Sequence, residues 1–480
     1  MIQYTRIISR NVSFAAFSVY LPLLISACSF QQYTPKTIDP VANAARFERK
    51  DPASAKFQQY LAANGYAENR LPLQQWGVDD LIYCALYFHP SLDVARAQWR
   101  LTESAEAISA ERPVPVINGH LANSNRANHD ISPFAFGLSI DIPIETANKR
   151  DLRIENARHL TQAAKLETAQ MAWQLRNQVI QSLNEYQFNQ QQINLFSDEE
   201  SHRQEIVAMY QKRVNIGAAS NVELSTAILQ LQTTTSELNA KKHNKLVLLA
   251  KLANSLGLPL AKVEAMHFVV DTDMQKVVDF QTDHLQTAAL LNRLDIRIAL
   301  ERYAAAEAKL KLEIAKQYPD LVISPGYAYE FGDRIWSLGL SGLLTLLNKN
   351  KLGIAQATQL REVEATQFEA LQSKVIAEAI IANTELIQAQ QTLNNQQNLR
   401  EQQQLSTRRM EHKFSAGEID RLELSFNRLE NIAADKNVAL AQFQLKTAMN
   451  QLDNALQKPV SVLQNNQKSS ISIEDLSFKN

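Results

Sequence analysis

Glycine, cysteine and clustered histidine are all scarce in this sequence, and each shortage excludes a class of protein. Only 12 of the 480 residues are glycine, which disfavours an all-β protein with many tight turns, because glycine supplies the positive φ angles that such turns need. The two cysteines, Cys28 and Cys84, are too few for a cysteine-based zinc site. The nine histidines are scattered, and no two of them stand four residues apart on a predicted helix. We therefore expect no metal site.

The sequence also lacks the motifs of nucleotide-dependent enzymes and of nucleic-acid-binding proteins. It contains no phosphate-binding loop and no glycine-rich nucleotide motif, so we expect no cofactor and no enzymatic activity. The formal net charge is -1, which provides no general basic surface for nucleic acid. After the N-terminus, no apolar run of about 18 or more residues predicts a transmembrane helix.

The first 27 residues have the features of a targeting segment. Arg6 and Arg10 precede an apolar stretch over 12–25, as in a signal peptide. The stretch ends in Leu-Ile-Ser-Ala followed by Cys28, which resembles a bacterial lipobox. We interpret 1–27 as a lipoprotein signal peptide and Cys28 as the lipidated residue; the alternative is an ordinary secretory signal that contains a cysteine. Because Ser29 follows, the sorting rule for such lipoproteins implies the outer membrane.

If Cys28 is acylated, Cys84 has no partner for an intrachain disulfide, and we expect it to be a buried structural thiol. Residues 28–77 then form a lipid-anchored N-terminal leader. Because this leader is polar and contains several prolines, we expect an extended segment that wraps the body of the protein.

One motif occurs twice, at 213–225 and at 413–425, with no gap between the copies. In each copy, one helix is expected to end at a glycine, Gly217 or Gly417, and the next to begin at a Ser or Asp cap. Ser220 and Glu223 match the capping-box pattern. A repeat at a long fixed period predicts that each half of the chain forms one structural unit.

Each half shows the same order of predicted elements: a helix, a β-hairpin, a very long helix and a second helix. The first repeat covers 78–260, with elements at 78–111, 114–144, 146–216 and 221–257. The second covers 282–460, with elements at 282–317, 321–345, about 349–416 and 421–457. Residues 261–281 form a linker between the repeats, and 461–480 form a C-terminal tail.

The predicted strands alternate strictly between apolar residues and small or polar ones. Phe134, Phe136 and Leu138 alternate with Ala135 and Gly137. Strands of about 10 residues with this pattern suit a membrane β-hairpin, although a hairpin on a soluble domain is the alternative. A helix of about 70 residues is about 105 Å long, so the two shorter helices of a repeat can lie end to end beside it. Apolar residues on the long helix follow coiled-coil spacing: Leu175, Val179, Leu183, Tyr186 and Ile193.

Four strands cannot close a barrel, and an open sheet edge cannot lie in lipid. Three copies of the chain would supply twelve strands, an even number in the range of known barrels. The predicted fold is therefore mainly α with a small β part. Long coiled-coil helices form an α-barrel, and four strands per chain contribute to a trimeric, twelve-stranded outer-membrane β-barrel.

On these features the chain resembles the TolC family of outer-membrane efflux proteins, over about 35–460. The resemblance rests on the duplicated plan and on Gly217 and Gly417, each followed by Glu-Leu at 223–224 or 423–424. It implies a lipid-anchored homotrimer in the outer membrane that extends into the periplasm. The trimer would be the passive duct of a tripartite efflux system, with a periplasmic adaptor and an inner-membrane pump of the RND type.

Tyr318-Pro319-Asp320-Leu321 and Asn348-Lys349-Asn350 look like the cobalt–zinc–cadmium efflux branch of this family. That branch usually has Pro-Leu-Pro-Leu-Phe-Asn-Arg-Asn at the second motif, whereas this chain lacks both prolines. The exported substrate stays open between metal cations, other small molecules and peptides.

The resemblance also assigns roles to the helix turns. In the family the turns contact the adaptor; here these positions are Ile216, Gly217, Ala218, Ala416, Gly417 and Glu418. Acidic residues after the glycines close the periplasmic aperture, which implies Glu223 and Glu423, with Phe414 as an apolar constriction. The family's basic residue after the second glycine is replaced by Ile419. Whether the two glutamates gate the channel or only cap helices stays open.

Two other functions fit the same features. One is an outer-membrane duct for type I secretion of proteins or peptides. The other is a coiled-coil lipoprotein that connects envelope layers without a pore. Strands with an apolar lipid-facing side favour a duct, because a scaffold has no need of them.

We predict that Cys28→Ala abolishes incorporation of labelled fatty acid, because the acylated thiol is removed. Cys84→Ala is the matched control and should keep the label. Unchanged labelling of the Cys28→Ala protein would refute the lipobox assignment.

Overall fold

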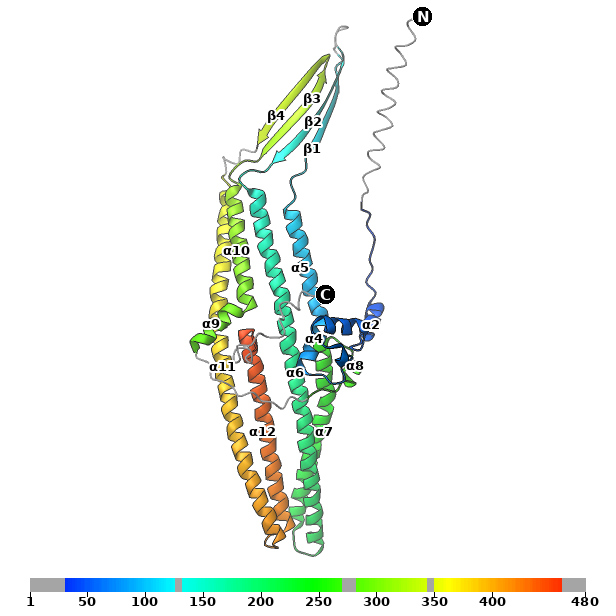
Figure 1. Ribbon diagram of the computed structural model, residues 1–480, viewed down its shortest axis with the longest axis vertical. Helices are drawn as coiled ribbons and strands as arrows, with labels where there is room; N and C mark the ends of the chain where they lie inside the picture. Colours follow the sequence, from blue (N-terminus) through cyan, green and yellow to red (C-terminus); the bar gives the residue numbers. More distant parts are fainter. Residues whose placement is uncertain (1–30, 126–131, 270–281, 343–348, 460–480) are drawn as a thin grey trace. The chain divides into compact units, whose positions relative to one another are not determined.

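The computed structural model describes residues 31–125, 132–269, 282–342 and 349–459 (Figure 1). The chain divides into two compact units, 1–49 and 50–480, and each is considered by itself. In the first unit, α2 (Pro40–Glu48) begins after Asp39, whose carboxylate accepts a hydrogen bond of 2.9 Å from the Val41 N–H. The predicted signal peptide, the predicted lipidation site Cys28 and the predicted tail at 461–480 lie outside the described residues.

The expectation that the leader is extended is wrong, because α2 and two further helices form within it. Residues 55–63 form α3 (Ala55–Ala63), and 68–70 form a short 3-10 helix, η1 (Glu68–Arg70). Phe57, Tyr60 and Leu61 are buried on one face of α3. Their spacing is that of an amphipathic helix, and it decides the local structure despite the flanking prolines.

The helices predicted at 78–111 and 282–317 are each broken in two. The first is α4 (Val78–Phe88) and α5 (Pro90–Ser109), joined through His89 in an extended conformation with φ -77° and ψ 123°. Proline disfavours a helical conformation of the residue before it, which explains this break. The second is α9 (Thr282–Asn292) and α10 (Leu294–Ala315), joined at Arg293 with φ -68° and ψ 130°.

The very long helices form as predicted. They are α6 (Lys149–Asn215), with 67 residues, and α11 (Lys351–Ser415), with 65. Each is followed by a helix of 36 residues, α7 (Asn221–Leu256) or α12 (Arg421–Leu456). Both α5 and α7 pack against α6, in succession along its length (Figure 1), and α10 and α12 pack against α11. A short helix, α8 (Leu260–Glu264), follows α7.

Leucine ladders on these helices form the core. Leu175, Val179 and Leu183 of α6 are buried in one cluster with Leu252 and Leu256 of α7. Leu386 of α11 belongs to the corresponding cluster of the second half, with Leu452 and Leu456 of α12. In the first cluster Cys84 is completely buried, and this burial raises the pKa of its thiol. Cys84 is therefore a packed, unreactive thiol, as expected from the sequence.

The strands form one antiparallel sheet in the order β1-β2-β3-β4. Its strands are β1 (Val116–Asn123), β2 (Phe134–Ile144), β3 (Leu321–Glu330) and β4 (Asp333–Gly342). The two hairpins join through β2 and β3, in a register that pairs Phe136 with Tyr329 and Ile144 with Leu321. The sequence predicts each hairpin but not this pairing between them. The expected end of the second hairpin, at 343–345, lies outside the described residues.

The passage from strand to long helix depends on residues in the left-handed conformation and on polar side chains. Asn148 and Asn350 have φ of 56° and 47°. Lys149 donates to the backbone oxygen of Tyr318 at 2.6 Å and pairs with Asp320 at 2.7 Å. Asn350 donates to the backbone oxygen of Glu313 at 2.8 Å. The residues that resemble the cobalt–zinc–cadmium branch therefore have a structural role at this junction.

Gly257 ends α7 with φ +67°, and a Cβ there would lie 2.7 Å from the His89 Cα. We predict that Gly257→Ala lowers the melting temperature of the purified protein, followed by circular dichroism. The substitution combines left-handed strain of about 1–2 kcal/mol with a backbone clash of about 1–3 kcal/mol.

The matched control is Gly217→Ala. Gly217 has φ +75° but no atom within 4 Å of the added Cβ, so only the strain should act. Equal destabilisation by the two substitutions would contradict the close packing of α7 against the His89 break.

Candidate functional site

One face of the sheet is apolar along its whole length. The strand register places the side chains of Phe136, Tyr329 and Trp336 on this face, and the exposed fractions of Trp336, Leu338 and Leu340 are 81%, 76% and 71%. Near the β3–β4 turn, the ring centroids of Tyr327 and Trp336 are 4.8 Å apart, and those of Phe136 and Tyr329 are 5.3 Å apart. Aromatic rings gathered at one end of an apolar band are typical of strands that cross an outer membrane.

The opposite face carries small and polar side chains. On β2 and β4 these are Ala135, Gly137, Ser139, Asp141, Ser337, Gly339 and Ser341, with Ile335 of β4 as an apolar exception on this face. Near the helix-proximal end of the sheet, Asn118 donates a hydrogen bond of 2.7 Å to Asp141. A sheet with one apolar face and one polar face can separate lipid from water. Within the described residues, β1 and β4 each pair on one side only, so the sheet has two open edges.

At the far end of the long helices, the two turns of the repeated motif have the same backbone geometry. Gly217 and Gly417 have φ of +75° and +76°. The Ala218 N–H bonds to the Arg213 oxygen at 2.7 Å, and the Glu418 N–H bonds to the Lys413 oxygen at 2.9 Å. These bonds satisfy helix-end carbonyls, as in a Schellman motif. We refer to residues 213–223 and 413–423 as the two tips.

The two tips differ in how their helix N-termini are capped. Ser220 accepts from the Glu223 N–H at 3.2 Å, and Glu223 accepts from the Ser220 N–H at 2.8 Å. The Ser220 hydroxyl also donates to the Glu223 carboxylate at 2.8 Å, and this bond together with the one from the Ser220 N–H lowers the pKa of Glu223. At the second tip, Asp420 accepts from the Glu423 N–H at 2.9 Å. No return bond from the Glu423 carboxylate occurs in the described part of the chain, so the capping-box interpretation holds for Glu223 alone.

An ion pair that the sequence analysis did not predict connects the tips. Arg213 Nη2 lies 2.6 Å from Asp420 Oδ2. The bond from the Glu423 N–H, and then Arg213, lower the pKa of Asp420. The side chains are 35% and 54% exposed, so the pair stabilises the contact by about 0.2–1 kcal/mol. The basic residue of this ion pair therefore stands before the first glycine, at Arg213, and not after the second glycine. The repeated motif contains a basic residue at this position in both copies, Arg213 and Lys413.

The contact between α6 and α12 becomes more exposed towards the tips. Far from the tips, Arg176 and Asp453 are 3.0 Å apart with side chains only 11% and 15% exposed. In the middle, Phe188 and Phe443 stack with ring centroids 4.6 Å apart. Closer to the tips, Lys436 pairs with Glu199 and lies over the ring of Phe196. The Arg213–Asp420 pair at the end is therefore the least shielded of these contacts.

The structure places the predicted tip residues at the exposed ends of the helices. Ile216 is 79% exposed and Phe414 is 40% exposed. Gly217, Ala218, Ala416, Gly417, Glu418, Glu223 and Glu423 are exposed or nearly so. Since α6 and α12 are in contact, both tips lie at one end of the second unit.

No group of three or more His, Cys, Asp or Glu side chains among the described residues could hold a metal ion. None of the helices in the described ranges contains a segment long and apolar enough to span a bilayer.

Residues 81–258 match the family model of outer membrane efflux proteins, which confirms the resemblance predicted from the sequence. No curated protein matches the chain.

Several solved structures share the fold. The Campylobacter jejuni CmeC outer membrane channel is 14% identical, with a TM-score of 0.65, and the match covers 94% of this chain and 98% of CmeC. For the outer membrane protein VceC of Vibrio cholerae the identity is 16%, the TM-score 0.65 and the coverage 79% and 96%. The open state of the Neisseria gonorrhoeae MtrE outer membrane channel is 13% identical, with a TM-score of 0.60, and the match covers 80% of this chain and 89% of MtrE.

At these identities the structural likeness shows the fold, which confirms the predicted combination of long helices and a small antiparallel sheet. Together with the family match, the fold supports an outer-membrane efflux channel. The family model and these solved structures are of outer-membrane channels and not of enzymes, in agreement with the expectation of no enzymatic activity.

Proposed function

We propose that three copies of this chain form a passive export duct across the outer membrane. The observation that carries this proposal is a sheet with an apolar face, a polar face and two open edges. Unpaired backbone groups at a sheet edge cost several kcal/mol each in lipid. Joining β4 of one copy to β1 of the next removes these edges, and three copies supply twelve strands, an even number.

The helix tips are the proposed contact with a periplasmic adaptor, which in turn connects the duct to an inner-membrane pump of the RND type. Both tips are exposed, and the first carries apolar side chains at its end: Ile216 and Val222 are 79% and 75% exposed. Exposed branched apolar side chains at the end of a coiled coil are typical of a surface that binds a partner.

The same end is the proposed periplasmic aperture. Glu223 is held in its capping box, whereas the Glu423 carboxylate makes no bond in the described residues. Of the two acids, Glu423 is therefore the better candidate for an aperture residue, and Phe414, 40% exposed at the end of α11, is the proposed apolar constriction. Acylation of Cys28 would anchor each copy to the outer membrane, and the long helices of the duct would extend into the periplasm. The proposed cargo is metal cations or other small molecules, and type I secretion of proteins or peptides is the alternative.

The purified chain should insert into a planar lipid bilayer and conduct ions, and native mass spectrometry in detergent should give three copies. We predict that Trp336→Asp abolishes insertion, because it puts a charge on the apolar face of β4. Ser337→Asp is the matched control. Ser337 is the next residue of β4 and lies on the opposite, polar face, so this variant should still conduct. A monomer that never conducts would contradict the duct and favour a scaffold.

Docking is tested separately from conduction. We predict that Ile216→Asp leaves bilayer conductance unchanged but strongly reduces export and co-purification of the adaptor in cells, because a desolvated charge opposes an apolar contact. Val247→Asp, at a 55% exposed position of α7 far from the tip, should behave like the native chain. Normal adaptor recovery with Ile216→Asp would argue against the tip as the docking surface.

A further inference from the structure

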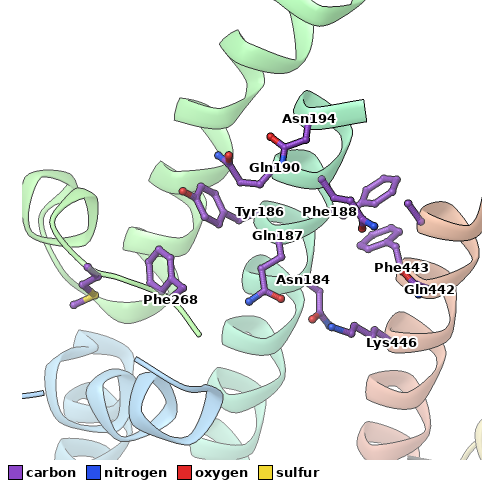
Figure 2. Close-up of a pocket in the computed structure, with 13 residues that line it drawn as sticks. Asn184, Tyr186, Gln187, Phe188, Gln190, Asn194, Phe268, Gln442, Phe443 and Lys446 are labelled. Carbon is purple, nitrogen blue, oxygen red and sulfur yellow. The ribbon is translucent and has the colours of Figure 1, made fainter. Parts of the chain in front are cut away.

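A cavity of about 620 Å³ lies between α6, α12 and the segment that follows α8, far from both the sheet and the tips (Figure 2). This volume is within the usual range for small-molecule sites. Met266 and Phe268 line one side, and Phe443 lines the other. The cavity belongs neither to the proposed passage through the sheet nor to the docking surface.

Planar neutral amides dominate its polar lining. Six of them come from α6 and α12: Asn184, Gln187, Gln190, Gln191, Asn194 and Gln442. Gln187 uses its Nε2 to donate to the Val269 oxygen at 3.1 Å, which leaves its Oε1 able to accept. The Gln190 side chain is partly buried, and its amide interacts with the Tyr186 hydroxyl. In Figure 2 the Gln190 amide lies beside the Tyr186 hydroxyl.

Aromatic rings provide the rest of the wall. On one side the rings of Phe188 and Phe443 are stacked, with centroids 4.6 Å apart (Figure 2). On the other side the rings of Tyr186 and Phe268 meet edge to face, with centroids 5.5 Å apart. Burial raises the pKa of Tyr186, which therefore stays a neutral hydroxyl at physiological pH. The wall thus combines flat apolar faces with groups that both donate and accept.

These features define the class of ligand. An amide both donates and accepts, as does a hydroxyl group, so a lining of amides suits a ligand rich in hydroxyls. The C–H face of a pyranose ring is apolar and flat, and it packs on an aromatic ring. The one charged side chain that lines the cavity in the described residues is Lys446, and no carboxylate lines it there. This lining disfavours a cationic ligand and leaves a cation that can donate to a ligand oxygen. We propose that the cavity binds a short oligosaccharide, of about two or three pyranose rings at this volume.

The test uses the full chain in a detergent without a sugar head group, because a maltoside would compete. Binding is followed by calorimetry with two probes, a β-1,4-linked N-acetylglucosamine tetramer and maltotetraose. Binding of the first alone identifies an N-acetylated glycan, and binding of the second alone a plain glucan; either result supports the site. The proposal would be overturned if neither sugar bound. It would also be overturned if the peptide trialanine bound and the sugars did not.

Variants locate the site. Gln191→Leu and Gln442→Leu remove amides from partly or fully exposed helix positions, and leucine keeps the helix propensity. Together they should weaken binding at least tenfold. Gln191→Leu alone should do so several-fold if the pair proves too unstable to purify. Gln372→Leu on α11, outside the cavity, is the matched control. Unchanged affinity in the variants would place any sugar binding elsewhere and refute this site.

Discussion

Backbone N–H and C=O groups at the edge of a sheet must find partners, and lipid offers none. This constraint governs the whole chain. The four strands pair antiparallel and leave β1 and β4 open on their outer sides, while one face of the sheet is apolar enough to meet a bilayer. A single copy cannot satisfy both conditions, so the strands require neighbours. Each long helix follows a strand closely in the sequence. The first, α6, begins at Lys149 after β2 ends at Ile144, and the second, α11, begins at Lys351 after β4 ends at Gly342.

The helices are stabilised differently in their middle part and at the tips. In the middle, leucine ladders between α6 and α7 and between α11 and α12 are excluded from water. Near the tips, two exposed ion pairs connect the halves within the described residues: Arg213 with Asp420 at 2.6 Å and Arg421 with Glu205 at 3.7 Å. Such pairs contribute little free energy. The tips can therefore separate without disturbing the packed middle, which suits a surface that must accommodate a partner.

Much of this fold was predictable from the sequence, because its strongest signals are long and periodic. The absence of proline and glycine from 146–216 predicts α6 almost to its ends, and strict alternation predicts β2 and β4. The errors arose where one residue overrides a pattern. Pro90 forces His89 out of the helix, and Arg293 makes the equivalent break without proline, held by Asp295 and Glu378. The Arg213–Asp420 pair and the cavity at Phe443 depend on side chains distant in sequence, which no local pattern brings together.

The pairing of β2 with β3 has a consequence for assembly. It joins the last strand of one hairpin to the first strand of the next hairpin, with Ala135 opposite Glu330 and Ile144 opposite Leu321. In the proposed ring, β4 meets the following β1 in the same sense, last strand to first. The seam within one molecule is thus a template for the seam between molecules, and the closed structure approximates six related units arranged head to tail rather than three unrelated blocks.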